Sequence, residues 1–211
     1  MKILLPGRIN FAAALDLQEQ VVEDLLAGRG EETLLLLEHE PVYTIGRTRD
    51  RSSLREELPH PVFETNRGGQ ATYHGPGQLV GYPILDLNKR GRDLHLYLRF
   101  LEEYLIDFSA MFGVEAHRRE GLTGVWVEGP RKLASLGVGV RRWVSMHGFA
   151  INIRREAIKS FTHITPCGIA GVEMTSLEQA GNTDIPMEQA TETAKKLFCE
   201  QIVRGLPILG S

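Results

Sequence analysis

Cys167 is the residue of this sequence best placed to act as a nucleophile. It lies in the segment THITPCGIAG, between a proline and a glycine, where a sharp backbone turn is expected to hold the side chain outward. A buried loop cysteine without a chemical role is the alternative that this segment leaves open. The second cysteine, Cys199, lies beside Phe198 inside a predicted helix and is expected to be a small core residue.

A thiol needs a neighbouring group to react at neutral pH, because its ordinary pKa of about 8.5 leaves it mostly protonated. Lys132 begins the segment KLASLG, which is otherwise apolar and small, so it is predicted to open a buried strand. An ammonium beside Cys167 favours the thiolate, and a desolvated lysine can itself give up a proton. His74, His147 and His163 are alternative activators.

Residues 67–83, RGGQATYHGPGQLVGYP, concentrate five glycines among polar side chains. Glycine lets the backbone approach a ligand closely, and backbone N–H groups in such a loop can point at a carbonyl or phosphate oxygen. Several side chains add donors of different kinds. The sequence therefore predicts a binding loop here, with a simple turn between strands as the alternative.

Nucleotide and metal motifs do not fit this sequence. It contains no G-x-x-x-x-G-K-[ST], and the third glycine of GPGQLVG comes one residue too late for the dinucleotide fingerprint. The seven histidines include no H-E-x-x-H pair, and the two cysteines are far apart. We expect neither a metal nor a cofactor.

Composition bounds the class of protein. The 211 residues suit one domain, 1–211, and the net charge of −3 argues against a nucleic-acid partner. No segment approaches the roughly 20 apolar residues of a membrane helix. Two cysteines make a disulfide framework improbable on composition, so a cytoplasmic location is expected.

Hydrophobic periodicity predicts one α+β domain with a central mixed sheet flanked by helices. Helices are expected from Asn10 to near Gly28, from Asp93 to Gly113, and over 186–206. Strands are expected at 33–39, 42–46, 62–66, 78–87, 114–118, 123–128, 132–140 and 143–153, the last two forming a hairpin.

Four segments together resemble one known family. RGGQATYHGPGQLVGYPILDL, RKLASLG, HGFAINI and TPCGI follow the order and approximate spacing of the lipoyl(octanoyl) transferases, and the resemblance covers nearly the whole chain. It implies the α/β fold of biotin and lipoate protein ligases and a cytoplasmic enzyme that needs no ATP.

The resemblance also implies an activity. Such enzymes take an octanoyl group from octanoyl-acyl carrier protein and deliver it to a lysine of lipoyl domains, in 2-oxoacid dehydrogenases and in the glycine-cleavage H protein. This is the first step of endogenous protein lipoylation. Cys167 corresponds to the acyl-thioester nucleophile, and Lys132 to the residue that lowers the pKa of its thiol.

Three segments correspond to the family's substrate-binding residues. They are Arg67, Gly68, Gly69, Gln70, Ala71, Thr72, Tyr73 and His74; Ser135, Leu136 and Gly137; and Gly148, Phe149 and Ala150. The small residues Ala134, Gly137, Gly139, Gly148 and Ala150 are expected to leave room for an octanoyl chain, although they also suit close strand packing. Arg47, Arg49 and Arg51 suit either acidic partner surfaces or a solvated loop.

Two other functions stay open at this point. An ATP-dependent lipoate or biotin protein ligase would share the fold without depending on Cys167. A non-catalytic module that binds acyl carrier protein would keep the loops and turn nothing over.

Overall fold

The main sheet has eight strands in the part of the chain that the computed structural model describes, residues 1–165 and 171–208. Across the sheet the order is β1 (Lys2–Ile9), β2 (Thr33–His39), β6 (Gln78–Ile84), β10 (Val144–Asn152), β9 (Arg131–Arg141), β8 (Leu122–Trp126) and β7 (His117–Arg119). The short β11 (Glu173–Met174) pairs with the start of β9. The β1–β2 and β9–β11 pairs are parallel and the others antiparallel, so the predicted mixed sheet is confirmed.

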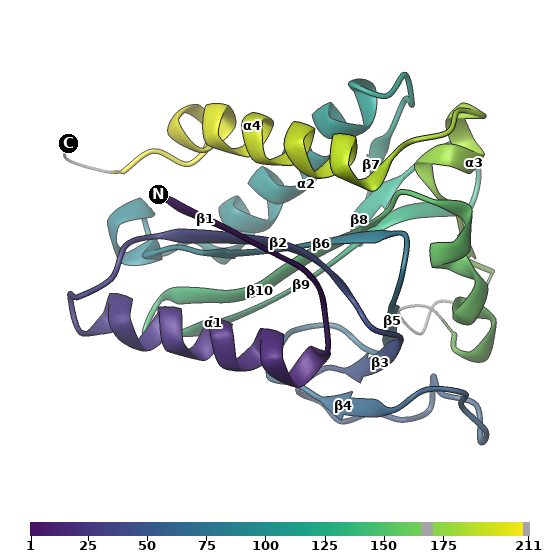
Figure 1. The fold of residues 1–211 in the computed structure, drawn as a ribbon, viewed down its shortest axis with the longest axis horizontal. Coiled ribbons are helices and arrows are strands. Elements are labelled where there is room, and N and C mark those ends of the chain that lie inside the picture. The colour runs from purple at the N-terminus through teal and green to yellow at the C-terminus, as the bar shows by residue number, and fades with distance from the viewer. Residues whose placement is uncertain (166–170, 209–211) are drawn as a thin grey trace.

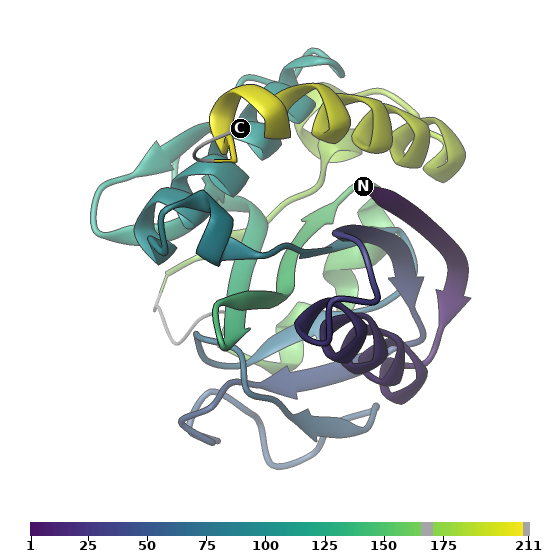
Figure 2. The ribbon, with the colours of Figure 1, turned by 90° about the vertical axis from the view of Figure 1, so that its left-hand side faces the viewer.

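Helices cover both faces of this sheet (Figures 1 and 2). One face carries α1 (Phe11–Leu26), and the other carries α2 (Leu94–Ala110) and α4 (Met187–Gly205). The remaining helical segments are η1 (Leu87–Arg90), η2 (Arg155–His163) and α3 (Leu177–Gly181). Asn10 caps α1 by accepting from the N–H of Ala13, as its residue type predicts.

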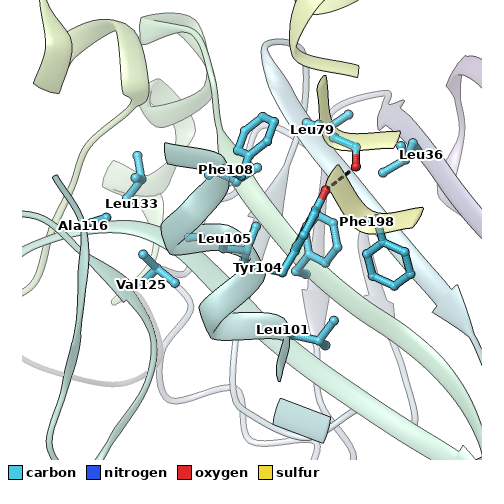
Figure 3. Packing of buried hydrophobic residues seen from close by; sticks show 14 of the residues in the cluster. Leu36, Leu79, Leu101, Tyr104, Leu105, Phe108, Ala116, Val125, Leu133 and Phe198 are labelled. Atoms are coloured by element: carbon cyan, nitrogen blue, oxygen red, sulfur yellow. Dashed lines mark hydrogen bonds between the residues drawn. The ribbon is translucent and has the colours of Figure 1, made fainter. Parts of the chain in front are cut away.

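The larger core lies between the sheet and the pair α2 and α4 (Figure 3). Leu101, Leu105 and Phe108 of α2 recur at three- and four-residue spacing and are fully buried. Tyr104 packs edge to face on Phe198 of α4, and its hydroxyl donates to the carbonyl of residue 194 at 3.0 Å. The contacts of Tyr104 with α4 thus hold the two helices together.

A second, three-stranded sheet lies beside the N-terminal end of α1 (Figure 1). Its order is β4 (Val62–Glu64), β3 (Val42–Ile45) and β5 (Thr72–His74). Phe11, the first residue of α1, packs on Phe63 of β4 with ring centroids 5.3 Å apart. The glycine-rich residues 67–71 connect β4 to β5, so this small sheet holds the predicted binding loop in place.

Several features differ from the sequence predictions, among them the short elements β5, β11, η2 and α3, which were not predicted, and β7, which begins three residues later than the predicted strand 114–118. Strand β1 was not predicted, because Pro6 and Gly7 interrupt its apolar pattern, and its pairing with β2 shifts register at this point. Cys199 is exposed, so its predicted core position is wrong. The buried face of α4 follows Ala190, Ala194 and Phe198 at four-residue spacing, and the residue after Phe198 turns about 100° away from that face.

No helix among the described residues is long and apolar enough to cross a membrane.

Replacing Leu101 by alanine is expected to lower the free energy of unfolding by about 2–5 kcal/mol, because Leu101 is fully buried between α2 and the sheet. Leu96 lies on the same helix but is 47% exposed, so Leu96→Ala is expected to change stability by less than about 0.5 kcal/mol. Urea unfolding of both variants checks this pair. Equal losses would contradict the burial assigned to α2.

Candidate active site

A narrow slot lies between the main sheet and the glycine-rich loop. The empty space in and around it is about 490 Å³, a volume that includes open solvent. Its lining is mostly apolar, which suits an alkyl chain. The lining residues are Phe11, Arg67, Gly69, Gln70, Ala71, Thr72, His74, Tyr82, Ser135, Leu136, Gly137, His147, Gly148, Phe149 and Ala150.

The slot exists because two paired strands carry small residues beneath the loop. In the β9–β10 register Ser135 is opposite Ala150, and Gly137 is opposite Gly148. A Cβ atom added to Gly137 would come within 3.0 Å of Cδ of Arg67. Side chains of ordinary size at these positions would therefore fill the space under the loop.

Not every small residue of this region opens the slot. Ala134 packs in the core on the α2 side, and Gly139 lines an adjoining cavity instead. A Cβ atom at Gly148 would lie 2.4 Å from the carbonyl oxygen of Gly81 in β6, so Gly148 is also required for close strand packing. Some of these small residues thus form the slot, others serve core or strand packing, and Gly148 does both.

The glycine-rich loop is tied down on both sides of the slot. The N–H of Gly68 donates to the carbonyl of Val138 in β9 at 2.9 Å. The Arg67 guanidinium donates to the Thr44 carbonyl at 2.9 Å and to its hydroxyl at 2.8 Å. A Cβ atom at Gly46 would lie 1.9 Å from the carbonyl oxygen of Gly69, so this loop packs without room for a side chain there.

Two residues of the predicted segment 67–74 do not line the slot. Gly68 acts through its backbone bond to β9. Tyr73 turns away and packs in a separate cluster with Tyr43 and Phe161, with ring centroids 5.4 and 5.6 Å away. The other predicted substrate-binding residues surround the slot, and their role in binding stays a prediction.

Three lining residues, Phe11, Tyr82 and His147, were not among the predicted substrate-binding residues, although Tyr82 lies in the predicted loop 67–83 and His147 was named as an alternative activator. Phe11 opens α1, far from the loop in sequence, and only the docking of α1 brings it to the slot. His147 has a left-handed backbone with φ of 56°, and its N–H donates to Oε1 of Gln18 at 2.8 Å. The sequence signal was the position of Tyr82 and His147 inside motifs already singled out.

Buried imidazoles stand at one side of the slot in neutral form. Nδ1 of His39 faces the carbonyl of Ile9 at 3.3 Å, and its Nε2 lies 2.7 Å from the Tyr82 hydroxyl. Because a carbonyl can only accept, Nδ1 carries the proton and Nε2 accepts from Tyr82. Burial lowers the pKa of His39 and that of His147 to about 4, with the Arg67 charge adding to the effect on His147.

A chain of buried hydrogen bonds leads from the slot to the start of β9. Nδ1 of His74 lies 2.7 Å from Oε1 of Gln78, whose Nε2 donates to Oδ1 of Asn152 at 2.9 Å. Nδ2 of Asn152 donates to the carbonyl of Thr175, and the N–H of Thr175 donates to the carbonyl of Lys132 at 3.0 Å. Burial holds the pKa of His74 well below its ordinary value.

Lys132 is buried at the start of β9, with 1% of its surface exposed. It is opposite Trp126 of β8 on one side and Met174 of β11 on the other. Its Nζ donates to the carbonyl of Thr123 at 3.1 Å and lies 5.2 Å from the centre of the Trp126 ring. Lys132 does not line the slot, but Ser135, three residues further along the same strand, does.

A β-bulge decides which face of the sheet Lys132 occupies. The β8–β9 register pairs Val125 with Ala134 and Trp126 with Lys132, so Leu133 is an extra residue on β9. Leu133 and Ala134 both pack in the core on the α2 side. Alternation on either side of the bulge therefore puts Lys132 on the face that carries Ser135 and the slot.

Cys167 lies outside the described residues, so its predicted pairing with Lys132 stays a prediction. Backbone hydrogen bonds hold the described chain on either side of the segment 166–170. Before it, the N–H of Thr165 donates to the carbonyl of Ser53 at 2.8 Å. On the other side, Glu173 and Met174 pair with Arg131 and Lys132. The activators proposed as alternatives, His74, His147 and His163, lie in the slot wall or at the end of η2.

The arginines at 47, 49 and 51 are exposed, as expected of a solvated loop. Arg49 and Arg51 both pair with Glu64, at 3.4 and 3.3 Å. Such exposed pairs contribute little to stability. Within residues 1–165 and 171–208, no three His, Cys, Asp or Glu side chains are grouped as a metal site would require.

Comparison with known proteins agrees with this arrangement. The chain matches the family described as Lipoyl protein ligase A/B catalytic domain over residues 10–199. An octanoyltransferase from Citrifermentans bemidjiense is 58% identical over 201 residues, which are 95% of this chain and 97% of that protein. An octanoyltransferase from Geobacter sulfurreducens is 53% identical over 207 residues, 98% of this chain and 87% of that protein.

The fold has solved counterparts. A crystal structure of lipoate-protein ligase A bound with ATP superposes with a TM-score of 0.71 at 13% identity, covering 95% of this chain and 85% of that one. At this identity the likeness concerns the fold alone, and it confirms the predicted lipoate ligase-like architecture.

Acidification is expected to destabilise the protein through the buried imidazoles. Their pKa is lowered from 6.5 to about 4 in His39 and His147, so between these pH values the unfolded chain binds more protons than the native state. The free energy of unfolding therefore falls as pH decreases from 6.5 to 4, by on the order of 1 kcal/mol per pH unit for each histidine. Urea unfolding at pH 7 and pH 4.5 measures the loss.

His147→Asn is expected to show a smaller loss between these two pH values than the parent, since asparagine tolerates the left-handed backbone and does not titrate. His95 is exposed, and His95→Asn is the control that should lose as much as the parent. Equal losses in all three proteins would rule out His147 as a contributor.

Proposed function

Because the chain belongs to the lipoyl protein ligase A/B catalytic-domain family, we propose that it transfers an octanoyl group from octanoyl-acyl carrier protein to the target lysine of lipoyl domains. The chain is an acyltransferase, as its relatives named octanoyltransferase indicate. The finer proposal is that the octanoyl group passes through a thioester on Cys167. Lys132 lowers the pKa of that thiol and then acts as proton donor and proton acceptor.

The observation that carries the proposal is the slot of small residues on the same strand and face as a buried lysine. Ser135 and Gly137 leave space for an alkyl chain, and the neutral imidazoles of His74 and His147 in the slot wall add no charge to it. At about 3.3 Å per residue, Lys132 precedes Ser135 by about 10 Å of strand. An acyl chain in the slot would thus have its carbonyl end directed toward the lysine.

The first step forms the acyl-enzyme. The Cys167 thiolate attacks the carbonyl of the pantetheine thioester, the new C–S bond forms, and the C–S bond to pantetheine breaks. The Lys132 ammonium gives a proton to the departing pantetheine thiolate and becomes a neutral amine. One thioester replaces another, so no ATP is needed.

The second step delivers the acyl group. The neutral amine of the acceptor lysine attacks the thioester on Cys167, the C–N bond forms, and the sulfur leaves as a thiolate. Neutral Lys132 takes the proton that the attacking nitrogen loses, which restores the original ammonium and thiolate. Two sequential steps let a large donor protein leave before the acceptor arrives.

Partners and location follow from the same proposal. The donor is acyl carrier protein, and the acceptors are lipoyl domains such as those of 2-oxoacid dehydrogenases and the glycine-cleavage H protein. The enzyme acts in the cytoplasm.

Mixing the protein with octanoyl-acyl carrier protein, without ATP, is expected to add one octanoyl group that intact mass and a peptide map assign to Cys167. Hydroxylamine should remove it, and apo-lipoyl domain should accept it. Cys167→Ser should remain unlabelled, whereas Cys199→Ser should label like the parent.

Other outcomes assign other functions. If no group attaches until ATP and a free acid are supplied, the protein is a ligase. If carrier protein binds and no acyl group moves under either condition, it is a binding module. Labelling that persists in Cys167→Ser contradicts the proposed nucleophile.

Substituting a large side chain into the slot is expected to shorten the preferred acyl chain. Ser135→Leu places extra carbons where the chain would lie, so kcat/KM for octanoyl relative to butanoyl carrier protein should fall at least about tenfold, a change of about 1.4 kcal/mol. The control Ser52→Leu changes an exposed residue outside the slot and should keep the parent ratio. An unchanged ratio in Ser135→Leu would place the chain elsewhere.

A further inference from the structure

Glu102 is a buried acid that the proposed reaction does not use. It lies on α2 with 1% of its surface exposed. Its Oε2 accepts from the Arg99 side chain and from Nε of Arg118 at 3.2 Å, while its Oε1 accepts from the N–H of Gly124 at 3.0 Å. A carboxylate so enclosed keeps its place only when hydrogen bonds offset its desolvation. One of those bonds is made to the backbone of β8.

Gly124 has a backbone that other residues rarely adopt, with φ of 132°. A Cβ atom there would lie 2.6 Å from Cε and 3.0 Å from Nζ of Lys132, and 2.8 Å from the carbonyl oxygen of Ala134. The Lys132 side chain therefore passes over the bare α-carbon of Gly124. No larger residue fits while the lysine keeps this course.

The carbonyl just before Gly124 in the chain completes the arrangement. Nζ of Lys132 reaches the carbonyl of Thr123, the residue that precedes Gly124. The peptide between Thr123 and Gly124 thus presents its N–H to Glu102 and its carbonyl to Lys132. A shift of this peptide would move both contacts together.

We propose that Glu102 and Gly124 are positioning residues for Lys132: Glu102 orients the peptide that receives the ammonium, and Gly124 leaves the space through which the lysine side chain reaches it. The inference rests on the role proposed for Lys132. Neither residue touches substrate, so both act through the lysine.

Other charged groups surround this corner of the sheet. Arg119 of β7 lies over the Trp126 ring at 4.9 Å, and Arg118 of β7 bonds to Glu102. Arg131 precedes Lys132 in β9, and Glu173 of β11 is opposite Arg131 in the strand register. Among these described groups, Glu102 is the one whose hydrogen bond ends on the peptide that Lys132 contacts.

The test compares Gly124→Ala with Gly121→Ala, each made with Lys132 and again with Lys132→Met. Gly121 also has positive φ, 73°, but a Cβ atom there meets nothing within 4 Å, so it reports backbone strain without contact to the lysine. All proteins carry Cys199→Ser, which removes the exposed thiol. Thermal unfolding first checks that each variant is folded.

Two measurements report whether Lys132 still acts on the thiol and on the transfer reaction. One is the pH at which alkylation of Cys167 by iodoacetamide reaches half its maximal rate, and the other is kcat for octanoyl transfer. Gly124→Ala is expected to move the alkylation midpoint most of the way to that of Lys132→Met and to lower kcat at least tenfold. In the Lys132→Met background it should add nothing, because its effect acts through the lysine. Gly121→Ala should behave like the parent.

A folded Gly124→Ala protein with parental midpoint and kcat would overturn the inference, as would an equal effect in both backgrounds. If Lys132→Met itself leaves alkylation and transfer unchanged, the role of Lys132 in the proposed function fails as well, so the two failures are distinguishable.

If Gly124→Ala does not fold, Glu102→Gln takes its place. Glutamine keeps the size of the side chain and replaces a charge-assisted hydrogen bond to Gly124 by a weaker neutral one. The alkylation midpoint and kcat are therefore expected to change in the same direction as in Gly124→Ala, but by less. The control is Glu103→Gln, one residue along α2, where the carboxylate is 55% exposed and also bonds to Arg118. Equal behaviour of these two variants would contradict the inference.

Discussion

A lysine ammonium enclosed within a sheet is the constraint on which this end of the molecule depends. An ion of this kind is costly to desolvate unless acceptors meet it. Here a carbonyl and the face of Trp126 lie beside Lys132, with β8 and β11 on its two sides. The bare α-carbon of Gly124 leaves the space that this side chain occupies.

The same strand that holds the cation continues as the wall of an apolar slot. Small residues at alternate positions of β9 are opposite small residues of β10, and a loop tied to both sheets covers them. The histidines in the slot wall, His74 and His147, stay neutral because burial disfavours their charged form. Space for an alkyl chain thus lies next to the end of β9 that holds Lys132, and the charged Arg67 side chain in the slot wall donates to the carbonyls of Thr44 and Gly68.

Sequence periodicity was enough to place the three long helices, most strands and the binding loop. The apolar stripe of α2 and the alternation of β9 and β10 are local signals, and the motif residues 69–72, 135–137 and 148–150 do surround one slot. Phe11 and the partner of Tyr82, His39, carried no such signal. Phe11 reaches the slot, and His39 reaches Tyr82 in the slot wall, because α1 and β2 dock there. This docking depends on contacts between segments far apart in the chain.

By itself the sequence determined the residue types available for chemistry, the α+β class and the presence of a glycine-rich loop, because each is encoded in a few neighbouring residues. Only the tertiary structure decided the face that Lys132 occupies. Strict alternation would put it with Ala134, yet the extra residue Leu133 reverses its side. The bulge forms where β9 pairs with β8, and its position depends on the interactions between the two strands. The sequence of either strand alone does not specify it.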